Sequence, residues 1–323
     1  MYNMALLGID LGATKVTFAT FSETGIIISK ETILLGKRKG KKVGSLLTEK
    51  ITFLIGSSGY GKDKIHAIGV SVPGISHSKT GTVWAPNIQG WDDYPLLQEI
   101  KTVSGDIPVT IDSDRACYIL GELWQGNAKG CRNAVYLSVG TGIGAGILVN
   151  SEILRGSRDI AGAIGWMALN KPFHEKYISC GCFEYHASGE GIAKMAREYI
   201  SQENIYTGIL RSKPAEELTS YDVFSAYENG DIVATKIIEQ CIEFWGMAVA
   251  NIVSLFNPEI IIMGGGIFGP AVRLIKEIRS EAEKWAQPIS MKQVRIIESA
   301  LSGDAGVYGA GFLARKKLIA KLL

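Results

Sequence analysis

Short apolar stretches separated by glycine open the chain and predict consecutive strands joined by tight turns. They read ALLGIDL, KVTFATF and GIIISKETIL, a rhythm typical of a β-meander. Amphipathic spacing predicts helices over 43–55 and near 94–103, and apolar runs predict strands at IHAIGVSV and PVTID, with a loop over 73–91. Because strand and helix patterns are both present, an α/β fold class is expected.

A second strand series repeats the opening pattern. The segment AVYLSVGTGIGAGILVN reads strand, glycine turn, strand, which suggests an internal duplication. An irregular glycine-rich stretch over 156–181 precedes a helix from about Phe183, a helical pair within 221–256, the strand EIIIM and terminal helices near 272–285 and 305–322. We expect two domains, over 1–112 and 113–306, with a C-terminal helix at about 307–323 packing back on the first.

Composition narrows the classes of function. The 323 residues carry a formal net charge of +2, so the chain lacks the basic excess of a nucleic-acid-binding protein. Its five cysteines are too few for a disulfide scaffold, no window approaches the roughly 18 apolar residues of a membrane span, and the N-terminus lacks a leader pattern. The basic run KRKGKK is interpreted as a solvated loop. We expect a cytoplasmic protein that acts on a small molecule, with no nucleic-acid or membrane partner.

Glycine loops follow predicted strands and carry the first chemical signal. They read DLGATK (10–15), GTGIGAG (140–146) and GGG (264–266). Glycine lets backbone N–H groups approach an anion closely, and a lysine or hydroxyl adds a donor. Any one loop is equally compatible with a plain hairpin turn, but such loops in both halves predict a bound nucleotide. The candidate ATP-binding residues are Asp10, Gly12, Thr14, Lys15, Gly140, Thr141, Gly142, Gly144, Gly264, Gly265 and Gly266, and Asp10 is also the candidate ligand of Mg²⁺.

Two familiar phosphate motifs do not fit the sequence. GSSGYGKD (56–63) nearly matches a P-loop, but Asp63 stands where Mg²⁺ needs a hydroxyl, and a strand follows. Gly140, Gly142 and Ala145 match a relaxed dinucleotide fingerprint, yet the strand-like AGILVN follows in place of a helix. A Walker-type NTPase and a Rossmann dehydrogenase are therefore disfavoured.

An ordered set of motifs carries a family resemblance. GIDLGATK, SVPG, APNIQGW, DSDRA, SVGTGIGAG, CFEYHASG and NPEIIIMGGG occur in this order, and together they resemble the ROK family of sugar kinases and sugar-responsive repressors. The resemblance implies an actin-like ATPase fold with two RNase H-like domains, ATP and a sugar in the interdomain cleft, and a homo-oligomer (dimer or tetramer). Repressors of the family carry an N-terminal helix-turn-helix domain, whereas this sequence starts at the first phosphate strand, which favours the kinase branch.

The resemblance also assigns roles around the sugar. Asp114 takes the place of the family's general base, while Asp112 is left to structure. Without the resemblance, both aspartates could simply cap the helix expected from Arg115. Glu184 matches a glutamate that hydrogen-bonds a sugar hydroxyl. The substrate-binding candidates are Gly74, Asn87, Ser113, Asp114, Trp166 and Glu184.

The chain departs from the family at polar sugar contacts. Glucose-binding members read AGExGH where this chain reads AGAIGW, so Ala163 and Trp166 replace a glutamate and a histidine, and Ser113 stands in place of an asparagine. A site built to hydrogen-bond particular hydroxyls loses affinity when those partners vanish. Plain glucose is therefore not the expected substrate. Trp166 either stacks on a sugar face or is a core aromatic residue.

The family's zinc ligands are altered as well. The replaced histidine is one of them, and Glu175 and Tyr177 occupy two of the three cysteine positions, so that only Cys182 is retained. The family zinc site is therefore expected to be lost. An alternative tetrahedral set would use Cys180, Cys182, His174 and His186.

These observations favour an ATP- and Mg²⁺-dependent sugar kinase. Asp114 would accept the proton of a sugar hydroxyl as that oxygen attacks the γ-phosphoryl group of ATP. Two alternatives stay open: a catalytically silent sugar or nucleotide sensor with the same fold, and a plain ATPase of the actin-like class.

Overall fold

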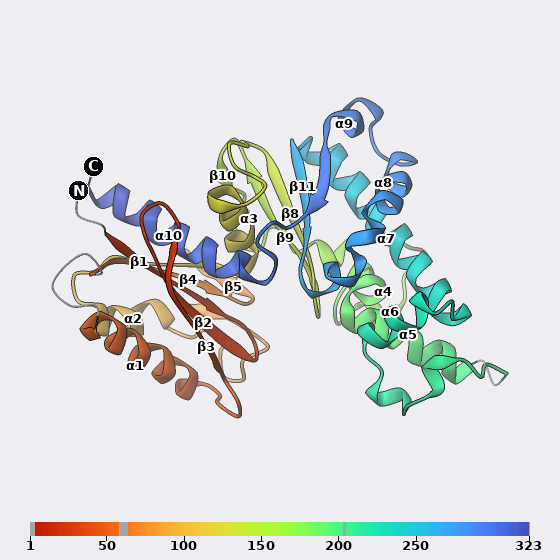
Figure 1. Cartoon of the computed structure of the whole chain (residues 1–323), viewed down its shortest axis with the longest axis horizontal. Helices are drawn as coiled ribbons and strands as arrows, with labels where there is room; N and C mark the ends of the chain where they lie inside the picture. Colours follow the sequence, from red (N-terminus) through yellow and green to blue (C-terminus); the bar gives the residue numbers. More distant parts are fainter. Residues whose placement is uncertain (1–3, 58–63, 203–204, 323) are drawn as a thin grey trace. The chain divides into compact units, whose positions relative to one another are not determined.

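The chain folds into two compact units, each containing one five-stranded sheet (Figure 1). The computed structural model describes residues 4–57, 64–202 and 205–322, so most of the GSSGYGKD stretch lies outside the described residues. Unit 1 comprises Met1–Gly130, Ile153–Ala161 and Ala300–Leu323, and unit 2 comprises Cys131–Glu152 and Gly162–Ser299. The predicted α/β class is confirmed.

The sheet of unit 1 has the order β3-β2-β1-β4-β7. β1 pairs antiparallel with β2 and parallel with β4, β2 pairs antiparallel with β3, and β4 pairs parallel with β7. The opening meander is therefore confirmed. The strands are β1 (Ala5–Leu11), β2 (Lys15–Phe21), β3 (Ile27–Leu34), β4 (Ile65–Val72) and β7 (Val109–Ser113), with a short hairpin of β5 (Ile75–Ser76) and β6 (Val83–Trp84).

Helices cover both faces of this sheet because β1 is apolar on both sides. Leu7, Ile9 and Leu11 belong to the core shared with α1 and α2, whereas Leu6 packs with the last helix on the opposite face. Gly69 lets that helix approach β4, since an added Cβ would lie 1.9 Å from the carbonyl oxygen of Ala310. The helices are α1 (Lys41–Ser57), α2 (Leu96–Ser104), α3 (Asp114–Gln125) and α10 (Ala305–Leu322).

Unit 2 repeats this arrangement. Its sheet has the order β10-β9-β8-β11-β12, with an antiparallel β8–β9 pair and parallel partners on the other side of β8. The two sheets thus share one topology, as the repeated sequence pattern suggested. The strands are β8 (Ala134–Val139), β9 (Ile143–Val149), β10 (Glu152–Ile153), β11 (Ile260–Gly264) and β12 (Arg295–Glu298).

The long helix α7 forms the centre of unit 2. Its N-terminus is capped by the Asp231 carboxylate, which accepts hydrogen bonds from the N–H groups of Val233 and Ala234. It ends where Asn257 adopts a left-handed conformation with φ 43°. The other helices are α4 (Cys182–Ala187), α5 (Gly189–Gln202), α6 (Ser220–Glu228), α8 (Ile275–Glu283) and α9 (Pro288–Gln293), and α7 itself spans Ile232–Phe256.

The boundary expected at residue 112 differs from the observed one. β7 continues directly into α3, and α3 packs against α10, so both helices belong to unit 1. The chain then returns to unit 1 at Ile153–Ala161 before completing unit 2. The physical reason is long-range packing, because Cys117 and Leu120 of α3 share a core cluster with Leu313 of α10, which lies far away in the sequence.

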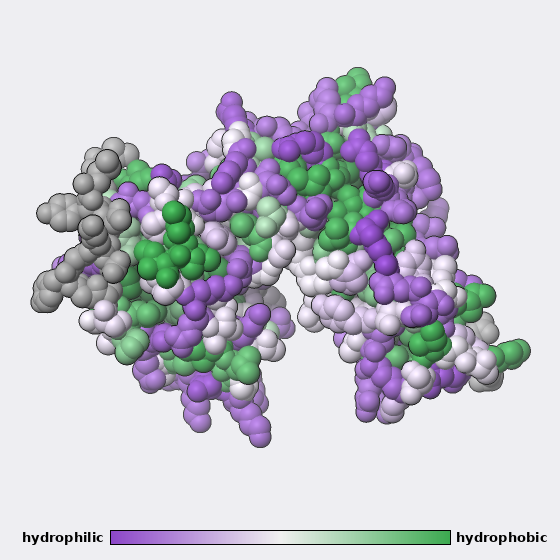
Figure 2. Space-filling view, in the orientation of Figure 1, coloured by the Kyte–Doolittle hydropathy of each residue, from purple (hydrophilic) through white to green (hydrophobic). Residues whose placement is uncertain are grey.

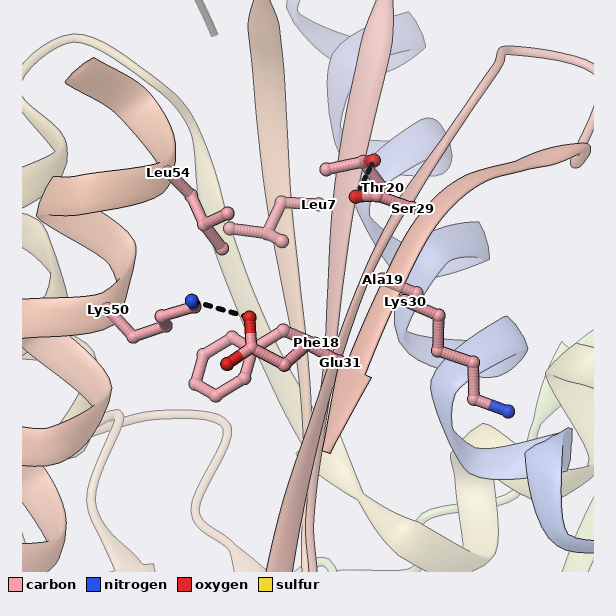
Figure 3. Close-up of a pocket in the computed structure, with 9 residues that line it drawn as sticks. All are labelled: Leu7, Phe18, Ala19, Thr20, Ser29, Lys30, Glu31, Lys50 and Leu54. Carbon is pink, nitrogen blue, oxygen red and sulfur yellow. Dashed lines mark hydrogen bonds and ion pairs between the residues drawn. The ribbon is translucent and has the colours of Figure 1, made fainter. Parts of the chain in front are cut away.

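A pocket in unit 1 is lined by residues of α1 and of strands β1, β2 and β3 (Figure 3). Lys50 from α1 forms an ion pair with Glu31 of β3 at 2.6 Å, beside the ring of Phe18. Its lining residues include none of those predicted for the nucleotide or the sugar. The pocket is therefore a feature of the packing between α1 and the sheet.

The visible surface carries hydrophilic and hydrophobic residues interspersed (Figure 2). The basic run at 37–42 is exposed at the start of α1, apart from the half-buried Gly40. Within the described ranges, no helix combines the length and apolarity needed to span a bilayer.

Candidate active site

Asp10 lies at the carboxyl end of β1 and is held there by neighbours from two elements. The Ser71 hydroxyl at the end of β4 donates a hydrogen bond to Asp10 Oδ1 at 2.7 Å. An added Cβ at Gly306, at the start of α10, would lie 2.5 Å from Asp10 Oδ2. Burial raises the pKa of the Asp10 carboxyl, while Ser71 and the charge of Lys15 oppose that rise. The carboxylate is thus fixed at a strand end, where α/β folds bind ligands.

The hairpin between β1 and β2 carries the first predicted phosphate loop. Gly12 N–H donates to the Lys15 carbonyl at 2.9 Å, and the Thr14 carbonyl accepts from Leu35 N–H at 2.8 Å. These bonds close the turn as an ordinary hairpin would. The side chains of Thr14 and Lys15 are exposed, and they are therefore available as donors to an anion.

Asp114 is the first residue of α3, directly after β7. The Ser113 hydroxyl caps the helix by accepting from Ala116 N–H at 3.4 Å, and Asp114 Oδ1 accepts from Arg115 N–H at 2.7 Å. Burial raises the pKa of the Asp114 carboxyl to about 6, against the lowering effect of Arg115 and of a hydrogen bond from Tyr118. A carboxylate with a pKa near neutrality is suited to accept a proton.

Asp112 does not cap the helix, contrary to one interpretation of the sequence. Its side chain is 2% exposed and forms an ion pair with Arg155, with both nitrogen–oxygen distances at 2.6 Å. Ser113 takes the capping position instead, which leaves its hydroxyl engaged with the backbone. Asp112 therefore has the structural role expected of it, through a partner that lies 43 residues away.

Gly74 and Asn87 lie in the loops that follow β4 and β6. Gly74 has φ +80°, and an added Cβ would lie 2.2 Å from the Trp84 carbonyl oxygen, so only glycine fits. Asn87 is exposed in the turn after Trp84, and that turn is braced by the stacked rings of Trp91 and Tyr94, 4.3 Å apart. Unit 1 thus collects Asp10, Gly74 and Asp114 at the carboxyl ends of β1, β4 and β7.

In unit 2, the loop between β8 and β9 is joined to Glu184. Glu184 Oε2 accepts a hydrogen bond from Ile143 N–H at 2.6 Å, and an added Cβ at Gly142 would lie 2.7 Å from the same oxygen. Burial raises the pKa of the Glu184 carboxyl. The structure therefore brings together the glutamate predicted for the sugar and the loop Gly140, Thr141, Gly142 and Gly144 predicted for phosphate.

The glycines after β11 adjoin the same loop. Gly265 has φ +88°, and an added Cβ would lie 2.4 Å from the Val139 carbonyl oxygen. Gly264 is buried against Tyr136, whereas Gly265 and Gly266 are exposed. The two glycine loops of unit 2 thus lie at the same edge of its sheet, where β8 and β11 both end.

Trp166 is not a core aromatic residue. It ends a short 3₁₀ turn over Ile164–Trp166 and is 57% exposed. Ala163 precedes this turn and has no polar side chain, whereas the glucose-binding motif AGExGH has a glutamate at this position. An exposed indole has a free face for an apolar or sugar surface.

The residues around Cys182 do not fit a zinc site. His186 is 4% exposed, its Nε2 shares a hydrogen bond of 2.8 Å with the Tyr177 hydroxyl, and its ring stacks on Phe244 at 4.6 Å. Over the described ranges, no three His, Cys, Asp or Glu side chains gather into a possible metal site. The alternative set of Cys180, Cys182, His174 and His186 is therefore wrong.

The carboxylates of unit 1 offer the type of ligand that Mg²⁺ prefers, although no three such side chains gather there within the described ranges. The charge of Asp10 contributes to the raised pKa of Asp114, so the two groups are close enough to repel each other. Mg²⁺ prefers oxygen ligands and binds through one or two carboxylates, waters and substrate phosphates. Asp10 supplies such oxygens at the end of β1.

Sequence reasoning missed several residues around Asp114. Ser71, Arg115, Tyr118 and Arg155 all contact or act on the aspartates at the strand ends. Ser71 and Arg115 lie inside quoted motifs and were available as signals. Arg155 was not, because no local pattern links it to Asp112.

Comparison with known proteins places the chain in a family. A glucokinase from Halalkalibacterium halodurans is 33% identical over 96% of this chain and 95% of its own length. A xylose repressor from Caldicellulosiruptor bescii is 30% identical over 89% of this chain and 73% of its own length. The crystal structure of a ROK hexokinase from Thermus thermophilus superposes with a TM-score of 0.80 at 26% identity, covering 98% of this chain and 100% of that one.

The family model agrees with these relatives. It matches residues 6–317 and is described as the ROK family. The resemblance and the two-domain fold inferred from the sequence are both confirmed. The chain belongs to the ROK family.

Proposed function

We propose that this chain is a sugar kinase that transfers the γ-phosphoryl group of ATP to a hydroxyl of a hexose or related sugar. The observation that carries the proposal is Asp114, a carboxyl at a strand end whose pKa is raised to about 6. The kinase names of the relatives support the same class of reaction. The family alone would not separate enzyme from sensor, but an intact base favours the enzyme.

In this proposal, Asp114 accepts the proton of the sugar hydroxyl as the hydroxyl oxygen forms a bond to γ-phosphorus and the bond from γ-phosphorus to the ADP oxygen breaks. The loops around Gly12–Lys15 and Gly140–Gly144 donate N–H groups to the phosphates, and Gly264–Gly266 approach the adenosine. When bound, Mg²⁺ offsets the charge of the phosphate oxygens, and Asp10 would hold it directly or through water.

The acceptor sugar is proposed to differ from plain glucose. Ala163 and Ser113 provide little for hydrogen bonding, the first because it is apolar and the second because its hydroxyl caps α3. Trp166 offers an exposed ring, and Glu184 and Asn87 offer polar groups to sugar hydroxyls. The candidate contacts of the sugar are Gly74, Asn87, Ser113, Asp114, Trp166 and Glu184.

The experiment is coupled ADP release with Mg²⁺-ATP across hexoses, hexosamines, N-acetylhexosamines and polyols. We expect ADP release that depends on one class of sugar and is lost in Asp114→Asn, with the variant still folded. Sugar-independent ADP release would indicate a plain ATPase. Silence across the panel, with ATP and a sugar still bound in titrations, would overturn the kinase proposal in favour of a sensor.

The sensor is the second candidate because a xylose repressor is among the relatives. It predicts binding of a sugar without phosphorylation and no effect of Asp114→Asn on ADP release. We also propose that the protein is cytoplasmic and forms a homo-oligomer, either a dimer or a tetramer. Sedimentation velocity at two protein concentrations tests the oligomeric state.

A further inference from the structure

Two arginines lie near the strand ends of unit 1, and they differ in how their charges are balanced. The Arg155 guanidinium donates to both oxygens of Asp112 at 2.6 Å, so its charge is neutralised. The Arg115 guanidinium donates from Nη2 to the Gly74 carbonyl oxygen at 3.2 Å. Among the residues that the structure describes, no carboxylate forms an ion pair with Arg115.

The Arg115 charge lowers the pKa of Asp114, but no described carboxylate lies within ion-pair distance of the guanidinium, and the position of Arg115 is otherwise unfavourable for a cation. Arg115 is partly buried, and it lies in the first turn of α3, where the helix dipole disfavours a cation. Its hydrogen bond to Gly74 uses one of the five guanidinium N–H donors. A neutral side chain could donate the same bond, so this contact alone does not explain a charged group.

Arg115 also lies beside the chemistry. It directly follows Asp114, and its side chain reaches from the end of β7 to Gly74 beyond the end of β4. The guanidinium therefore lies at the end of the sheet that carries Asp114, where the proposed reaction brings the acceptor hydroxyl. A guanidinium presents its donors as a planar fork that matches carboxylate and phosphate oxygens.

We propose that Arg115 binds an anionic group of the acceptor sugar, and that the preferred substrate is therefore a sugar acid or a sugar phosphate. This inference rests on the proposed kinase function and names its substrate class. A carboxylate and a phosphate offer the same pair of oxygens to the fork, so the two sources are separated by experiment.

The experiment compares acceptors in neutral and anionic pairs at pH 8, with saturating Mg²⁺-ATP and coupled ADP release. The pairs are glucose with glucuronate, N-acetylglucosamine with N-acetylmuramic acid, and fructose with fructose 6-phosphate. They place the anionic group at different positions and separate carboxylate from phosphate. We expect one anionic member to exceed its neutral partner by about 10- to 100-fold in kcat/KM, the range for a charge-assisted hydrogen bond.

The variants assign that preference to Arg115. Arg115→Met is expected to lower kcat/KM for the anionic acceptor by about 10- to 100-fold and to change its neutral partner by less than about threefold. Arg115→Lys retains the charge without the fork and is expected to lie between. Lys317→Met, at an exposed position about 16 Å along α10 from Gly306, is the matched control for loss of a positive charge.

Two outcomes would overturn the inference while the kinase proposal stands. One is a working enzyme that prefers a neutral acceptor in every pair. The other is an equal loss for neutral and anionic acceptors in Arg115→Met, which would mean that Arg115 acts on Asp114 or on ATP. Absence of sugar-dependent ADP release would sink the kinase proposal itself. In that case calorimetric titration of the anionic sugars into wild type and Arg115→Met decides whether Arg115 binds the anion.

Discussion

Arg155 donates two hydrogen bonds to Asp112, each 2.6 Å long. Arg155 belongs to Ile153–Ala161, a segment of unit 1 that lies in the sequence between the two stretches of unit 2. Asp112 lies two residues before Asp114, so the pair anchors the end of β7 from which the base projects. Bidentate geometry fixes orientation as well as distance.

Removal of Arg155 should therefore destabilise the fold. In Arg155→Met the Asp112 carboxylate stays buried without its partner, and we expect a loss of about 3 kcal/mol in the free energy of unfolding, at the low end for buried pairs because Arg155 is 39% exposed. Urea unfolding at pH 7 measures it. The double variant Asp112→Leu/Arg155→Met should recover most of the loss, and equal stability of the two variants would contradict the account.

The activity should depend on the ionisation of Asp114. Because its pKa is raised to about 6, we expect kcat/KM to be constant above that pH and to fall tenfold per pH unit below it. Tyr118→Phe removes a hydrogen bond that lowers this pKa, so the break should move to higher pH. Profiles of both proteins with one sugar test this. A break near pH 4 in either protein would show that Asp114 is not the group that titrates.

The same carboxyl should cost the protein stability once it is ionised. Its pKa in the folded state lies above the ordinary 3.8, so the folded state binds the proton more tightly than the unfolded state does. Below pH 3.8, Asp114→Asn should have the same free energy of unfolding as wild type. Between pH 3.8 and pH 6 the variant should become increasingly more stable than wild type, and above pH 6 the difference should level off at about 3 kcal/mol. Denaturant unfolding from pH 4 to 8 measures the difference. A constant difference across this range would refute it.

These expectations show where local sequence patterns suffice. IHAIGVSV is observed as β4 over Ile65–Val72, and the helix expected over 43–55 is observed as Lys41–Ser57, because period and end signals are local. The four-residue β12 was missed because so short a strand has no clear period. The partner of Asp112 and the continuation of unit 1 into α3 were missed for another reason, since both depend on segments far away in the sequence.

Loss of the Tyr177 hydroxyl should weaken unit 2. Tyr177→Phe leaves His186 Nε2 buried without a partner, and Nδ1 of the same ring already has none. We expect a loss of about 1–3 kcal/mol in the free energy of unfolding. Thermal unfolding of the variant against wild type measures it.

Chelation is the matching test on the wild type. His186 hydrogen-bonds with Tyr177 and stacks on Phe244, so it should not bind a metal ion. EDTA should therefore leave the Tm of the wild-type protein unchanged, and elemental analysis should find no stoichiometric zinc. A drop in Tm on chelation, restored by zinc, would overturn the assignment of these residues to a metal-free cluster.

Gly142 should not tolerate a side chain. In Gly142→Ala the new Cβ would lie 2.7 Å from Glu184 Oε2, so the glutamate or the loop must shift and the bond to Ile143 is strained. We expect a rise in KM for ATP or sugar of about tenfold, equivalent to one charge-assisted bond, in a folded protein. Gly56→Ala, where an added Cβ meets nothing within 4 Å, is the control. Equal kinetics of the two variants would count against a role for this contact.

The three separate stretches of unit 1 set an order for folding during synthesis. Val307, Ala314 and Leu318 of α10 complete the core to which Leu6 and Phe21 belong, so β1 and β2 cannot complete this core until α10 has been made. Unit 2 has all its residues by Ser299, before α10 exists. A premature stop within α10 would therefore leave the sheet of unit 1 open on one face, although all residues of unit 2 would have been made.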